Sequence, residues 1–140
     1  MKTLFFIFAT FIALSSCDKP SICEVSKENI IGSYKLTAAT YRSNSTATEI
    51  DYYDVISPDP CDKDDVFTFK SDGSFELVDA GLKCSPENND SGVWTLNGKT
   101  LTSDGDETTI EDFECNKRMV LSITDVYISG DKLKMTYIKQ

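Results

Sequence analysis

Histidine is absent from this sequence of 140 residues. Its absence excludes a Ser-His-Asp or Cys-His catalytic arrangement and removes a common ligand of zinc sites. The sequence also has no P-loop and no GxGxxG motif, so the common nucleotide-binding loops are missing as well. Basic residues are scarce, 14 against 23 acidic ones, and the net charge of −9 argues against nucleic acid as a partner.

A hydrophobic run long enough to span a bilayer, about 20 residues, is also missing. The uncharged run from Leu4 to Leu14 is shorter, follows Lys2, and predicts a signal peptide over residues 1–16. The next residues complete LSSC, which resembles the lipobox of bacterial lipoproteins and implies that Cys17 is acylated. Such acyl chains, palmitate among them, would hold the protein in the bacterial cell envelope. We expect the outer membrane or the cell surface rather than the inner membrane.

In this interpretation residues 17–26 form a lipid-anchored tether and residues 27–140 form one domain. VSKENII, residues 25–31, predicts a short helical turn with Ser26 as its N-cap. From Gly32 onward polar and apolar residues alternate, which is typical of half-buried β-strands. Eight or nine short strands with turn signals between them predict an all-β fold, an antiparallel up-and-down barrel of about eight strands.

Specific strand faces and registers follow from this alternation. The first strand is predicted to put Tyr34, Leu36 and Ala38 on one face and Ala39 on the other. A three-residue loop that ends at Gly73 sets Phe69 opposite Phe75 and Phe67 opposite Leu77. A two-residue Asn97-Gly98 loop sets Trp94, a predicted core residue, opposite Leu101.

Four cysteines remain once Cys17 is assigned to the lipid, and an even number outside the cytoplasm predicts two disulfides. Four cysteines allow three connectivities. Counted outward from the Gly73 loop, Cys61 lies one position from Cys84, so we predict this pair. Cys23 with Cys115 then follows by elimination.

One stretch of the chain resembles a known family. CDKDDVFTFKSDGSFEL, then Cys84, then GVWTLNGKTL is similar to the small lipocalin-like domains of Bacteroidota lipoproteins. The residues that open the first predicted strand, Gly32-Ser33-Tyr34, also resemble the start of a lipocalin, with tyrosine in the usual place of tryptophan. The resemblance covers about residues 27–138 and implies a lipocalin-like β-barrel, but it assigns no activity.

Acidic residues are plentiful, yet neighbouring acids on a strand point to opposite faces and do not share a substrate. The acidic stretches DPCDKDD and SDGDE could supply oxygen ligands for calcium, but neither has the spacing of an EF-hand loop. We therefore expect no enzyme, no metal site and no cofactor.

Two functions remain open. The first is a lipocalin-like barrel that holds a small apolar or amphipathic ligand, with Tyr41, Tyr52 and Tyr53 near its mouth. The second is a surface interaction or structural lipoprotein with a filled barrel, in which the long irregular segment 42–60 contacts a protein partner.

Overall fold

The described part of the chain, residues 23–140 of a computed structural model, consists mainly of antiparallel strands. The predicted signal peptide and Cys17 lie outside the described residues. The strands are β1 (Gly32–Arg42), β2 (Ile50–Asp51), β3 (Val66–Phe69), β4 (Ser74–Val78), β5 (Asp90–Asn97), β6 (Thr100–Ser103), β7 (Asp106–Glu114), β8 (Arg118–Thr124) and β9 (Lys132–Lys139). The helices are α1 (Lys27–Ile30), α2 (Tyr53–Ile56) and the 3-10 turn η1 (Asp62–Asp64).

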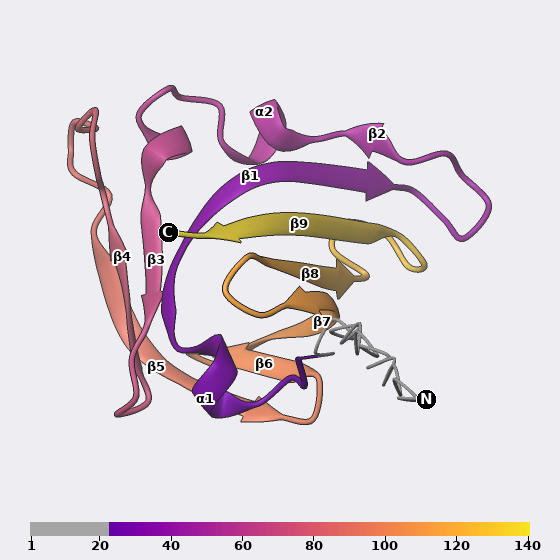
Figure 1. The fold of residues 1–140 in the computed structure, drawn as a ribbon. Helices are drawn as coiled ribbons and strands as arrows, with labels where there is room; N and C mark the ends of the chain where they lie inside the picture. The colour runs from indigo at the N-terminus through magenta and orange to yellow at the C-terminus, as the bar shows by residue number, and fades with distance from the viewer. Residues whose placement is uncertain (1–22) are drawn as a thin grey trace, which may run out of the picture.

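Eight strands close into a barrel, as the sequence predicts. Strands β3 to β9 follow one another around the wall, and β1 closes the wall because it pairs with both β3 and β9. Figure 1 shows how β1 bends, with its first half beside β3 and its second half beside β9. The short strand β2 lies outside this ring on the edge of β1, so segment 42–60 is more regular than its sequence indicates.

A β-bulge in β1 makes the predicted faces of this strand partly wrong. The pairing of β1 with β9 shifts register between Leu36 and Ala38, so the alternation changes phase there. Ala39 is therefore buried at 2% exposure, whereas Ala38 is exposed. Because of the same shift, Tyr41 lies on the same face of β1 as Tyr34. Without the bulge, strict alternation would put these two side chains on opposite faces.

The first predicted hairpin register is confirmed, and the second is wrong. Phe69 pairs with Phe75 across β3 and β4. Across β5 and β6, however, Trp94 pairs with Ser103 and not with Leu101, because the turn consists of Gly98 and Lys99. Only Gly98 in this turn has a positive φ, 59°, as a type II′ turn requires. Both registers put the same side chains inside, so alternation alone could not distinguish them.

Helix α1 closes one end of the barrel. Ser26 caps it as predicted, because the Ser26 side chain accepts a hydrogen bond from the Asn29 amide. Ile30 is fully buried in the core, and its carbonyl oxygen accepts a 2.8 Å hydrogen bond from the Tyr34 hydroxyl. The core that α1 covers contains these buried side chains: Tyr34, Phe69, Phe75, Trp94, Leu101, Ile110, Met119 and Leu121.

Two disulfides join distant parts of this barrel. One connects Cys61 with Cys84, whose Cα atoms lie 5.3 Å apart, and the other connects Cys23 with Cys115 at 5.5 Å. These are the pairs that the sequence favours. Within residues 23–140, no helix has both the length and the apolar character needed to cross a membrane.

Candidate functional site at the barrel rim

The end of the barrel that lies opposite α1 forms a rim. Strand β1 ends there at Arg42, β9 begins there at Lys132, and β8 ends there at Thr124, because these three residues are neighbours in the sheet. The connection between β8 and β9 and the segment that leads into β2 therefore both lie at this rim, where β1 and β9 run side by side (Figure 1).

Three tyrosines from three separate segments meet at the rim. Tyr41 comes from the end of β1, Tyr52 precedes α2, and Tyr127 comes from the connection between β8 and β9. The rings of Tyr41 and Tyr52 are stacked at 5.0 Å between centroids. Tyr127 meets both edge-on, at 5.6 Å from Tyr41 and 6.1 Å from Tyr52. These are the separations at which aromatic pairs attract one another. We call these three side chains the tyrosine rim.

A buried carboxylate holds the tyrosine rim together. Asp131 is only 1% exposed, and it accepts backbone hydrogen bonds from Val126 at 2.7 Å, Tyr127 at 3.0 Å and Ile128 at 3.1 Å. It also accepts a 3.0 Å hydrogen bond from the Tyr41 hydroxyl. One side chain thus fixes the β8–β9 connection and places Tyr127 against Tyr41.

The titration of these groups follows from the same contacts. Burial alone would raise the pKa of Asp131, but the backbone amides and the Tyr41 hydroxyl hold the pKa below its ordinary value. Burial and the hydrogen bond to Asp131 raise the pKa of Tyr41. The Tyr127 hydroxyl, and then burial, raise the pKa of Tyr52. Tyr41 and Tyr52 are therefore neutral phenols, and the negative charge of Asp131 is buried.

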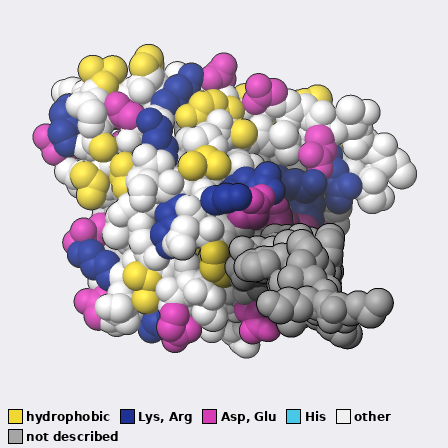
Figure 2. All heavy atoms as spheres, in the orientation of Figure 1, with side chains coloured by type: hydrophobic (Ala, Val, Ile, Leu, Met, Phe, Trp, Pro, Cys, Tyr) yellow, Lys and Arg dark blue, Asp and Glu magenta, His cyan; other side chains and the backbone are white. Residues whose placement is uncertain are grey.

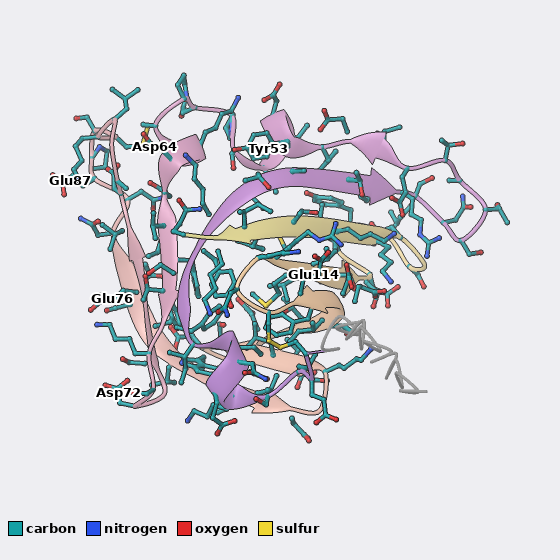
Figure 3. All side chains as sticks on the ribbon, in the orientation of Figure 1. Tyr53, Asp64, Asp72, Glu76, Glu87 and Glu114 are labelled. Atoms are coloured by element: carbon teal, nitrogen blue, oxygen red, sulfur yellow. A yellow bond between two sulfur atoms is a disulfide. The ribbon has the colours of Figure 1, made fainter. Side chains whose placement is uncertain are left out.

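The structure places Tyr53 elsewhere. Its hydroxyl donates a 3.2 Å hydrogen bond to the Leu36 carbonyl, and the Lys63 ammonium lies 5.5 Å from its ring centroid. Figure 3 shows Tyr53 between α2 and β1. Of the three tyrosines that are predicted to lie near the barrel mouth, the structure brings together Tyr41 and Tyr52. It adds Tyr127, for which the only sequence signal is an aromatic residue just before the Gly130 turn.

Aromatic side chains fill the interior at the α1 end. Tyr34, Phe69, Phe75 and Trp94 are each at most 5% exposed. Phe69 and Trp94 meet edge-on at 5.1 Å, and Phe67 stacks on Phe75 at 4.8 Å. A small molecule approaching this barrel would therefore find open aromatic surface at the rim and packed rings at the other end.

Two ion pairs lie on the outer wall beside the rim. Lys132 bonds to Glu111, and Lys134 bonds to Glu49. Figure 2 shows a band of dark blue side chains over β9 with magenta side chains next to it. The rim itself carries apolar surface, with Tyr127 58% exposed and Ile128 55% exposed. The contrast between paired charges on the wall and exposed apolar groups at the rim favours an uncharged or amphipathic ligand there.

Comparison with known proteins identifies the architecture. A family model described as a lipocalin-like domain matches residues 30–135. The match begins at Ile30 in α1 and ends at Met135 in β9, so it reaches all eight strands of the barrel and both sides of the rim. No curated protein and no solved structure matches the chain.

Proposed function

Because the chain belongs to the lipocalin-like domain family, we propose that it binds a small amphipathic molecule at its tyrosine rim. The observation that carries this proposal is the partly exposed cluster of Tyr41, Tyr52 and Tyr127 above a buried Asp131. Rings in such a cluster are already fixed in place, so a ligand that stacks on them meets a pre-organised surface. Only binding is proposed, without catalysis or a cofactor.

The same cluster indicates the chemistry of the ligand. Each tyrosine presents an apolar ring and a hydroxyl group that can donate or accept a hydrogen bond. Tyrosine also loses little conformational entropy on binding, because it has only two side-chain torsions. A molecule with a flat or aliphatic part and a few uncharged polar groups would match both features.

We further propose that Cys17 anchors the barrel to the envelope membrane through acyl chains. LSSC and the short apolar leader support this assignment. Cells fed radioactive palmitate should label the wild-type chain, and the substitution Cys17→Ser should abolish the label. Full labelling of the Cys17→Ser variant would refute the assignment.

A fluorescence titration tests the rim. The amphipathic dye 1-anilinonaphthalene-8-sulfonate, which joins apolar rings to one sulfonate, should bind the wild-type rim when it is added to the chain in a Cys17→Ser background. Tyr127→Ala should weaken the affinity for the dye about fivefold, since an aromatic pair contributes about 1 kcal/mol beyond its buried area. The matched control is Val93→Ala on β5, a variant that also truncates an exposed side chain, 64% exposed, away from the rim.

Equal dye affinity in Tyr127→Ala and Val93→Ala, with both variants folded by circular dichroism, would contradict the rim as the binding site. That result would favour the alternative in which segment 42–60 contacts a protein partner. In the structure this segment exposes Ile50 at 55% and Val55 at 56%.

A further inference from the structure

The Cys61–Cys84 disulfide has a carboxylate directly beside it. Cys61 precedes η1, Asp62 is the first residue of η1, and Cys84 lies in the connection between β4 and β5. The Asp62 Oδ1 atom lies 3.4 Å from the Cys84 sulfur. The two sulfurs and a carboxylate oxygen of Asp62 all lie within 4.8 Å of one another, and no other three acidic or cysteine side chains in the described part of the chain converge as closely. The Cys23–Cys115 disulfide has no acid in such a position.

Solvent reaches this disulfide through an open cleft. The cleft has a volume of about 540 Å³, and its lining includes Cys61, Asp62, Cys84 and Glu87. Both cysteines are half-buried, whereas most of the connection around Cys84 is exposed. A small thiol reagent and a metal ion can therefore approach the two sulfurs from outside the barrel.

Hydrogen bonds hold the two sides of the cleft together beside the disulfide. The Leu82 amide donates a 2.8 Å hydrogen bond to Asp64 Oδ2, and the Asn88 side chain donates one of 3.4 Å to Asp65 Oδ2. A Cβ atom added at Gly81 would clash with the Asp64 carboxylate, so only glycine permits this approach. Figure 3 shows the sulfur-to-sulfur bond close to Asp64. These contacts do not depend on the disulfide, so we expect the connection to stay against η1 when the sulfurs are separated.

We propose that Cys61, Asp62 and Cys84 bind a zinc ion once a dithiol has reduced their disulfide. A thiolate of the dithiol attacks one of the two sulfurs and breaks the bond between them. The second thiol of the reagent then resolves the mixed disulfide, so the reagent leaves as a cyclic disulfide and the chain gains two electrons and two protons as two thiols. Zinc displaces these two protons when it binds the thiolates.

The separation of the two cysteines suits zinc. Zinc bonds sulfur at about 2.3 Å and carboxylate oxygen at about 2.0–2.2 Å in tetrahedral geometry, which puts two thiolates about 3.8 Å apart. The Cα atoms of Cys61 and Cys84 lie 5.3 Å apart, so rotation of the two side chains is enough to reach this spacing. Asp62 supplies the third ligand and water the fourth. Soft thiolates select zinc over calcium and magnesium. The site shares no residue with the tyrosine rim and does not depend on its ligand.

Metal titration of the full chain, in the Cys17→Ser background, tests the site. The chain is reduced with dithiothreitol without oxygen, and the reductant is removed by gel filtration. The reduced chain should bind about one zinc ion at this site, and cobalt should give the near-ultraviolet charge-transfer band of thiolate ligands. The oxidised chain should give neither signal. Absence of binding to the reduced chain, equal binding to the oxidised chain, or a circular dichroism spectrum of an unfolded chain with zinc bound would each overturn the proposal.

Substitutions assign the ion to these three side chains. Cys84→Ser should abolish the cobalt band, and Asp62→Asn should weaken zinc binding by at least about tenfold. Glu87→Gln is the matched control, because Glu87 is an exposed acid of the same cleft and its loss should leave the zinc affinity unchanged. Wild-type affinity in Asp62→Asn would refute the site, since two thiolates alone would then hold the ion. Wild-type affinity in Cys84→Ser would also refute it, because the ion would then lie at Cys23 and Cys115.

Discussion

Replacing Trp94 with alanine should lower the free energy of unfolding by about 3–5 kcal/mol. The Trp94 side chain is 1% exposed, and its ring meets Phe69 at 5.1 Å. Its indole N–H also donates a 3.0 Å hydrogen bond to the Lys70 carbonyl. Alanine would leave a cavity among the packed rings, and the Lys70 carbonyl would keep only the 3.2 Å hydrogen bond that it accepts from the Gly73 amide. Both losses act on the part of the core that α1 covers.

Urea denaturation followed by far-ultraviolet circular dichroism measures this effect. Val93→Ala is the natural control, because Val93 is the preceding residue on β5 but is 64% exposed on the outer face. That variant should change the free energy of unfolding by no more than about 0.5 kcal/mol. If Trp94→Ala cost less than about 1 kcal/mol, the interior would not be the packed aromatic core described above.

Removal of the Cys23–Cys115 disulfide should have a similarly large effect. The two residues are 92 positions apart, and the chain-entropy model gives about 4–5 kcal/mol for a loop of that length. The double substitution Cys23→Ala and Cys115→Ala breaks the link without leaving a free thiol. Most of the loss arises in the unfolded chain, which becomes more expanded once the loop is open.

The Cys61–Cys84 pair provides the internal comparison. Its 23-residue separation predicts a smaller loss, about 3 kcal/mol, for Cys61→Ala with Cys84→Ala. Urea unfolding of the two double variants side by side should therefore rank the long loop above the short one. The reverse order would show that native-state contacts of the loop over Asp79, and not loop length, dominate the effect of these links.

The alternation of polar and apolar residues along the strands was enough to predict the barrel. It did not predict the positions at which the alternation changes phase. Phe69 opposite Phe75 follows from a Gly73 loop that only one register satisfies. The turn at Gly98 allows two registers with identical faces, so the pairing of Trp94 depends on backbone torsions that the residue pattern does not encode. The bulge in β1 could not be predicted either, because nothing in the alternation marks the extra residue between Leu36 and Ala38.

The sites depend even more on contacts between distant segments. Tyr41 and Tyr52 could be selected because they are aromatic residues in or beside a long connection. Tyr127 and Asp131 could not, because their role arises only when the β8–β9 connection folds against the end of β1. Asp79 likewise stands alone in the sequence. The Cys61–Cys84 disulfide brings the loop after Asp79 to the acids of η1, and spacing along the chain does not indicate this proximity.

The Cys23–Cys115 link also fixes where the described chain starts on the barrel. Cys115 lies in the turn between β7 and β8, and the first residue of β8, Arg118, is the neighbour of Ile138 near the covered end. Only five residues lie between Cys17 and Cys23, so even a fully extended chain reaches about 20 Å from one to the other. With a lipid on Cys17, the bilayer would therefore lie close to the α1 side, and the tyrosine rim would point outward into the aqueous compartment, toward arriving molecules.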